Sequence, residues 1–115
     1  MINEEKDLRD LYHRLIDYYT KTGIISEVQT FTEFSENHPD CSFLMNTDTD
    51  GLASIQKRLV LINDRKSQSE QFFTLMHELG HIVTGTNDER IADEIATALC
   101  QTVEALTGLT ITHAA

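Results

Sequence analysis

Hydrophobic residues recur every three or four positions between residues 8 and 19, with charged residues between them. The recurring residues are Leu8, Leu11, Tyr12, Leu15, Ile16, Tyr18 and Tyr19. This spacing predicts an amphipathic helix from about Asn3 to Thr22, and Gly23 is a natural point for the helix to end.

The pattern is less regular in the next 40 residues. Val28, Phe31 and Phe34 suit one face of a helix without settling the structure of residues 24–34, whereas residues 35–40, Ser-Glu-Asn-His-Pro-Asp, predict a loop. The apolar run at residues 41–45 predicts a strand, and residues 46–51 predict a turn. Two further runs, residues 52–55 and 58–63, predict a short hairpin, and Leu-Val-Leu-Ile in the second run is the strongest strand pattern of the chain.

Helical spacing returns in the second half of the chain. Ser67-Gln68-Ser69-Glu70 is a capping-box pattern that predicts the start of a helix, and Gly85 predicts its end. Its core-facing stripe is predicted to comprise Phe72, Leu75, Met76, Leu79, Ile82 and Val83, and its neighbouring face Phe73, His77, His81 and Thr84. A last helix is predicted, capped by Asn87 or Asp88 and ending near Gly108. The residues that recur at helical spacing along it are Ile91, Ile95, Ala98, Leu99, Thr102 and Leu106.

The chain has 115 residues, which suffices for one domain with a hydrophobic core and is too few for two. We therefore expect a single α+β domain over residues 1–115, with an N-terminal helix, a small sheet and two C-terminal helices. Nine basic residues oppose 19 acidic ones, for a net charge of −10, and the basic residues do not cluster. We therefore expect no direct binding to nucleic acid.

The chain shows no sign of export or membrane insertion. Its acidic first residues are not followed by an apolar segment, and the longest apolar run, Leu59–Ile62, is too short to cross a bilayer. Cys41 and Cys100 form no C-x-x-C pair and are expected to be free thiols. These features predict a cytoplasmic protein that does not contact a membrane.

Residues 77–81 read His-Glu-Leu-Gly-His, the HExxH pattern. On a helix, residues four apart lie on one face, about 6 Å apart along the axis. His77 and His81 can therefore offer two imidazole nitrogens to one zinc ion, and Glu78 lies beside them where a general base acting on water belongs. A catalytic zinc site needs a third protein ligand as well.

Carboxylates of the last predicted helix are the candidates for that third ligand. The metzincin pattern HExxHxxGxxH does not apply, because Thr84 and Asn87 occupy its glycine and third histidine positions. Glu89 and Asp93 share one helix face, so one can bind the metal while the other accepts the N–H of a histidine. Glu94, about 100° around the helix from Asp93, is the alternative ligand.

Two segments carry a more specific pattern. Residues 59–63, Leu-Val-Leu-Ile-Asn, lead through a short loop to Phe-Thr-Leu-Met-His-Glu-Leu-Gly-His at residues 73–81, and residues 89–96 read Glu-Arg-Ile-Ala-Asp-Glu-Ile-Ala. Together they resemble the ImmA/IrrE family of gluzincin-type zinc metallopeptidases, over about residues 59–99.

The resemblance implies a minimal zincin-like domain that contains Zn²⁺. It implies that His77, His81 and Glu89 bind the metal, that Glu78 is the general base, and that Asp93 holds a ligating histidine. The substrate it implies is a protein or peptide, such as a repressor encoded with this chain in a phage or mobile element.

Three functions remain open from the sequence. The first is a zinc-dependent endopeptidase; the second is a catalytically weak regulatory module that binds a partner protein; the third is a structural protein without metal. Peptide hydrolysis also needs a donor for the oxyanion. His113, Tyr12, Tyr18 and Tyr19 are candidates by residue type alone, and no spacing recommends His13 or His38.

Overall fold

Eight helices and strands make up residues 4–111, the part of the chain that the computed structural model describes. In chain order they are α1 (Glu4–Lys21), β1 (Glu27–Thr30), α2 (Phe31–Asn37), the 3₁₀ segment η1 (Pro39–Asn46), β2 (Gly51–Ser54), β3 (Leu59–Ile62), α3 (Gln68–Thr84) and α4 (Glu89–Thr107). The predicted α+β fold is confirmed, and three of the predicted helices lie within a residue or two of α1, α3 and α4.

Strand β3 is the centre of a three-stranded sheet with the order β1-β3-β2. β1 pairs with it in parallel and β2 antiparallel, so that Val28 and Ala53 both lie opposite Val60. The predicted hairpin is thus confirmed as β2 and β3. Within residues 4–111, β2 pairs on one side only, and its other edge has no partner strand there.

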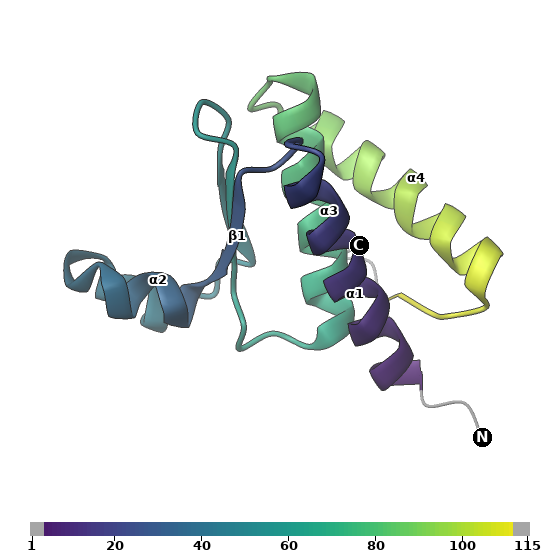
Figure 1. Ribbon diagram of the computed structural model, residues 1–115, viewed down its shortest axis with the longest axis horizontal. Coiled ribbons are helices and arrows are strands. Elements are labelled where there is room, and N and C mark those ends of the chain that lie inside the picture. The colour runs from purple at the N-terminus through teal and green to yellow at the C-terminus, as the bar shows by residue number, and fades with distance from the viewer. Residues whose placement is uncertain (1–3, 112–115) are drawn as a thin grey trace.

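The elements are layered, as Figure 1 shows, with α3 between the sheet and α4 and with α2 on the opposite side of the sheet. α1 and α3 cover one face of the sheet, and the main core lies beneath them. Its largest fully buried side chains include Ile25, Val60, Ile62, Phe72, Leu75 and Met76. Among the described residues, no helix combines the length and apolar character needed to cross a membrane.

A smaller cluster lies on the other face of the sheet and corrects one prediction. Residues 41–45 were expected to form a strand, but they belong to η1. Pro39 occupies the first turn of this segment, where its fixed φ favours a helical start. Cys41 and Leu44, three positions apart as a 3₁₀ turn requires, then pack toward Phe31 and Leu61. Cys41 and Cys100 are free thiols, as expected.

The ambiguous region before η1 divides between a strand and a helix. Thr30 ends β1 and caps α2: its hydroxyl accepts from the Glu33 backbone N–H, and the Glu33 carboxylate accepts from the Thr30 N–H. The predicted loop at residues 35–40 is wrong over most of its length, because residues 35–37 complete α2 and Pro39 and Asp40 begin η1. Strand β1 had no sequence signal, because Glu-Val-Gln-Thr contains a single strongly apolar residue.

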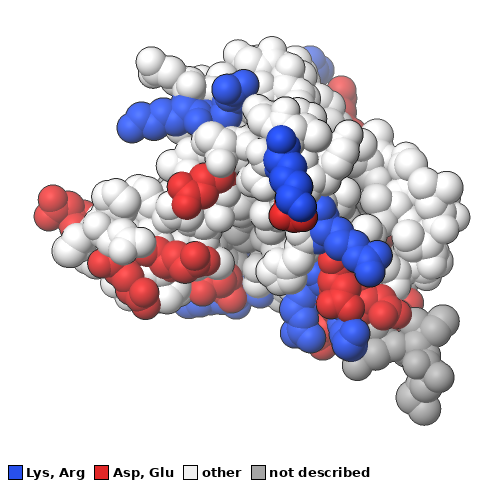
Figure 2. Space-filling model, in the orientation of Figure 1, with Lys and Arg blue, Asp and Glu red and all other residues white. Residues whose placement is uncertain are grey.

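Charged side chains are distributed unevenly over the face seen in Figure 2. Acidic side chains predominate over α2, whereas basic and acidic side chains alternate along α1. Two of the pairs along α1 are exposed ion pairs at helical spacing, Lys6–Asp10 and Lys21–Asp17. On this face no continuous basic surface is visible.

Candidate metal centre

Helices α3 and α4 approach closely because small residues face each other between them. A Cβ atom added at Gly80 would lie 3.3 Å from the Cα of Ala92. The fully buried positions of α4 are Ala92, Ala96 and Cys100, which pass along the same side of the helix. Of the six residues predicted at helical spacing along α4, Ile91, Ile95 and Leu99 are half-buried, whereas Ala98, Thr102 and Leu106 are exposed. Val83 of α3, also predicted to be buried, is 58% exposed.

The turn between the two helices is short and well defined. Gly85 adopts a left-handed conformation with φ of +69°, which ends α3 and which glycine adopts without steric cost. Three residues later, the Asp88 carboxylate accepts from the backbone N–H groups of Arg90 and Ile91 and caps α4. Glu89 therefore begins α4 directly beside the end of α3.

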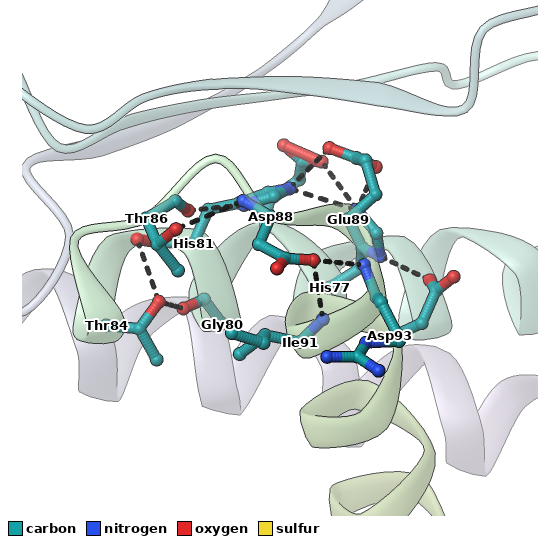
Figure 3. Close-up of polar contacts among 11 residues, drawn as sticks. His77, Gly80, His81, Thr84, Thr86, Asp88, Glu89, Ile91 and Asp93 are labelled. Carbon is teal, nitrogen blue, oxygen red and sulfur yellow. Dashed lines mark hydrogen bonds and ion pairs between the residues drawn. The ribbon is translucent and has the colours of Figure 1, made fainter.

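Three acceptor groups converge at this junction, as Figure 3 shows. The Nε2 atoms of His77 and His81 lie 3.2 Å apart. The Glu89 carboxylate spans both, with Oε2 2.9 Å from the Nε2 atom of His77 and Oε1 2.8 Å from that of His81. The Glu89 side chain is 74% exposed, so the group is open to solvent on the α4 side.

The other ring nitrogen of each histidine is anchored. Nδ1 of His77 lies 2.7 Å from the Asp93 carboxylate, and Nδ1 of His81 lies 2.8 Å from the main-chain carbonyl of Thr86. Both partners can only accept, so each Nδ1 carries a proton and donates it. In the neutral imidazoles the two Nε2 atoms then present lone pairs.

This donor set fits a zinc ion. Two lone pairs and a carboxylate within 3.2 Å repel one another unless a cation or additional protons lie between them. In a tetrahedral zinc site, ligand atoms roughly 2.0–2.1 Å from the ion lie about 3.3 Å apart, close to the observed separations. Anchoring of Nδ1 by a carboxylate or carbonyl is the usual arrangement around metal-binding histidines.

Glu78 lies beside this group, and one ligand atom each of His77, Glu78 and His81 lie within 4.8 Å of one another. Its side chain is buried, and its Oε1 atom is 3.8 Å from the Nε2 atom of His77. Burial raises the pKa of the Glu78 carboxyl from its ordinary value of 4.5 to about 7, although the nearby His77 and His81 rings lower it, and the Glu89 charge adds a small increase. A carboxyl with a pKa near neutrality can accept and release a proton at physiological pH.

The group opens into a cleft of about 520 Å³ between the helices and the sheet. Its lining residues are Thr49, Asp50, Gly51, Leu52, Ala53, Phe73, Thr74, His77, Glu78, His81, Asn87, Glu89 and Asp93. All of β2 but its last residue is therefore one wall of the cleft. A Cβ atom at Gly51 would lie 2.5 Å from Cγ2 of Thr74 and 3.6 Å from Cγ of Glu78, so glycine permits the close approach of strand and helix.

The remaining candidates that the structure describes lie away from this cleft. Glu94 is exposed and lines a separate shallow groove along α4. Tyr12 is buried in the main core, and Tyr18 and Tyr19 lie at the end of α1. His113 is outside the described residues. His13 packs against the ring of Tyr12, and His38 stacks on Phe34.

Sequence reasoning missed three contributors to the site. The Thr86 carbonyl is a main-chain group, so no residue type could have indicated it. Gly51 was expected in a turn, and its contact with α3 depends on how the sheet packs. Asn87 was considered as a helix cap, but it lines the cleft while Asp88 caps α4.

Comparison with known proteins gives one match. The family model Peptidase_M78, described as the IrrE N-terminal-like domain, matches residues 41–105, which include β2, β3, α3 and nearly all of α4. No curated protein and no solved structure matches the chain at a significant level. The family and the geometry agree on a small zincin-like α+β fold with a His77-Glu78-His81 group that could hold a metal.

Proposed function

The chain belongs to the Peptidase_M78 family, and on that premise we propose that it is a zinc-dependent endopeptidase that hydrolyses a peptide bond in a protein substrate. One observation carries the proposal: the His77 and His81 imidazoles and the Glu89 carboxylate, three groups that are able to bind a metal, converge beside the buried carboxylate of Glu78. Three protein ligands with a neighbouring base are the requirement for zinc hydrolases.

The roles of the side chains follow from their contacts. A zinc ion held here would polarise the carbonyl group of the substrate and make water more acidic. Glu78, in its ionised form, would accept a proton from the attacking water and pass it to the leaving amide nitrogen. Asp93 and the Thr86 carbonyl keep the two imidazoles in the tautomer that binds a metal.

The shape of the cleft supports an extended peptide as the substrate. The free edge of β2 borders the cleft, and its unpaired main-chain groups can pair with a peptide that adds to the sheet. Such a peptide would run past Glu78 and the metal ligands. By family resemblance, the protein substrate is a repressor encoded with this chain in a phage or mobile element.

The experiment compares zinc-loaded wild type with Glu78→Gln on two substrates: a proteome-derived peptide library and the product of the adjacent open reading frame. Cleavage is mapped by mass spectrometry, and zinc content is measured for each preparation. Glu78→Gln should retain zinc and lose about 10²–10⁴-fold in rate, because it removes only the base. Glu94→Gln, the same change at an exposed position outside the cleft, should cleave like wild type. Equal cleavage by wild type and Glu78→Gln would refute the proposal.

A catalytically weak module that binds a partner protein is the second candidate. The exposure of Glu89 favours it, because a hydrated carboxylate competes less well for the metal and the ion can exchange. On this alternative, the adjacent gene product would bind tightly to wild type and to Glu78→Gln and remain intact with both. Binding with cleavage by wild type alone would favour the endopeptidase.

A further inference from the structure

Amide hydrolysis places negative charge on the carbonyl oxygen, and a hydrogen-bond donor at that position stabilises the transition state. Three uncharged side chains that line the cleft can donate: those of Thr49, Thr74 and Asn87. We propose that the Asn87 carboxamide is this donor and is therefore a catalytic residue. The inference rests on the proposed endopeptidase function and extends it to a residue with no assigned role.

Location separates Asn87 from the two threonines. Thr74 lies one helical turn before Glu78 on α3, and Thr49 lies two residues before Gly51, the first residue of the strand against which Glu78 packs. Thr74 is buried against Gly51, and the Thr49 hydroxyl is already paired with that of Thr47. Attack on a carbonyl carbon moves the π electron pair onto the oxygen, so the donor must be a side chain that is open to the substrate.

Asn87 is exposed, lines the cleft and lies in the turn between α3 and α4. It directly follows Thr86, whose carbonyl anchors His81, and it stands two residues before Glu89. The turn is fixed at both ends by Gly85 and by the Asp88 cap, so the main chain at Asn87 is held relative to both metal ligands. Its carboxamide has no hydrogen-bond partner within residues 4–111 and remains available to a substrate.

The step balances without any further reactant. Water oxygen forms a bond to the carbonyl carbon, its proton passes to Glu78, and the π pair moves to the carbonyl oxygen, which accepts a hydrogen bond from Nδ2 of Asn87. The C–N bond then breaks as Glu78 returns the proton to nitrogen, and the carbonyl re-forms to leave a carboxylic acid and an amine. The acid then gives its remaining proton to the amine, so that the products are a carboxylate and an ammonium group. Asn87 gains no proton and loses none; it only stabilises the oxygen while it is charged.

The test uses Asn87→Ala in the full chain, loaded with zinc, on a peptide that wild type cleaves in the library assay. The expected result is a fall in kcat of about 10²–10³-fold, with KM and zinc content unchanged. Asn37→Ala, the same change at the exposed end of α2, should match wild type. A second readout is the affinity for a phosphinate peptide, whose tetrahedral anion resembles the transition state. Asn87→Ala should lower the affinity for the phosphinate peptide by about the same factor as kcat. The affinity for the amide peptide, measured in variants that also have Glu78→Gln and so do not cleave it, should stay the same.

Two results would overturn the inference while leaving the proposed function intact. One is a kcat for Asn87→Ala within threefold of wild type; the other is a lower kcat accompanied by an equal loss of zinc or of amide-peptide affinity. If wild type cleaves nothing, the proposed function fails on that result alone. The phosphinate comparison still decides the inference: weaker binding by Asn87→Ala supports contact with the anion, and equal binding refutes it.

Discussion

The two faces of the sheet are stabilised to very different degrees. Beneath α1 and α3, 14 described residues form one buried cluster, whereas the cluster beneath α2 and η1 contains three. The larger side also contains three of the four buried polar residues of the described chain, Thr74, Glu78 and His81, all on α3. The smaller side leaves Phe43 64% exposed.

This difference shows where a fold of this size can accommodate a reactive group. An unpaired carboxylate is costly to bury, and the cost can be offset only where many apolar side chains are removed from water nearby. Helix α3 is the element with both properties, because one face enters the main core and the next face lines the cleft. If this view is correct, substitutions on the two sides should separate stability from metal binding.

The largest effect is expected from a matched pair of leucine truncations. Leu75→Ala in the main core should lower the free energy of unfolding by about 4–5 kcal/mol, and Leu44→Ala in the small cluster by about 2–3 kcal/mol, because the smaller cluster can relax around the cavity. Urea denaturation measures both. Leu44→Ala should keep the wild-type zinc affinity. Equal losses of stability, or loss of zinc from Leu44→Ala, would remove the distinction between the two sides.

The next effect concerns the third ligand. Glu89→Ala should reduce zinc affinity by more than about 100-fold, beyond the loss typical of residues that only orient a ligand. Competition with a zinc chelator measures the affinity. Glu94→Ala, on the neighbouring exposed face of α4, is the control and should stay within about twofold of wild type. A severe loss at Glu94 with none at Glu89 would show that the ligand assignment is wrong.

Glu78 should destabilise the zinc-free fold in a pH-dependent way. Its folded-state pKa of about 7 exceeds the ordinary 4.5, so between these values the unfolded chain releases a proton that the fold retains. Stability is therefore lost as pH rises through this window. Glu78→Gln should be more stable than wild type by on the order of 2–3 kcal/mol at pH 8 and equally stable near pH 4.5. Thermal unfolding of both proteins with chelator present checks this. A difference in stability between Glu78→Gln and wild type that does not change with pH would contradict it. Added zinc should reduce the difference in stability at pH 8.

The smallest loss of zinc affinity is expected from changes to residues that only orient a ligating histidine. Asp93→Ala should lower zinc affinity by about 10–100-fold, because Nδ1 of His77 loses its acceptor. Thr86→Ala should leave zinc affinity unchanged, since the acceptor of His81 is a main-chain carbonyl. The same chelator competition measures the zinc affinity of both variants. Equal losses of zinc affinity in Asp93→Ala and Thr86→Ala would contradict the different roles assigned to the side-chain and main-chain acceptors.

The sequence predicted the helices and strand that form the candidate metal site better than it predicted the surrounding elements. HExxH, the capping box at Ser67 and the apolar run of β3 are local signals, and each appears in the structure as expected. The backbone of residues 41–45 depends on whether a neighbouring strand or a helix covers it, which five residues cannot specify. The contacts of Glu89 and Asp93 with His77 depend on how closely α4 approaches α3, and this is set by Gly80 against Ala92.

The buried side of α4 shows the same limit in another form. Periodicity favoured the bulkier line of Ile91, Ile95 and Leu99, but the helix turns alanines toward α3. A hydrophobic pattern identifies residues by how apolar their side chains are, whereas a close contact between two helices requires small side chains at the contact. The pattern therefore located the helix correctly and its rotation only approximately.

The two histidines differ in how mutation can remove the acceptor of their Nδ1 proton, because one acceptor is a side chain and the other is a main-chain carbonyl. A single codon change at Asp93 removes the acceptor of His77. No codon change at Thr86 removes the acceptor of His81, because every amino acid supplies the same carbonyl. That anchor is lost only when the turn is lengthened, shortened or deprived of the left-handed glycine at position 85. The Thr86 side chain contributes to the turn only through its hydroxyl, which accepts from the Asp88 N–H. Position 86 should consequently vary more among relatives than position 93, while the number of residues between His81 and Glu89 stays constant.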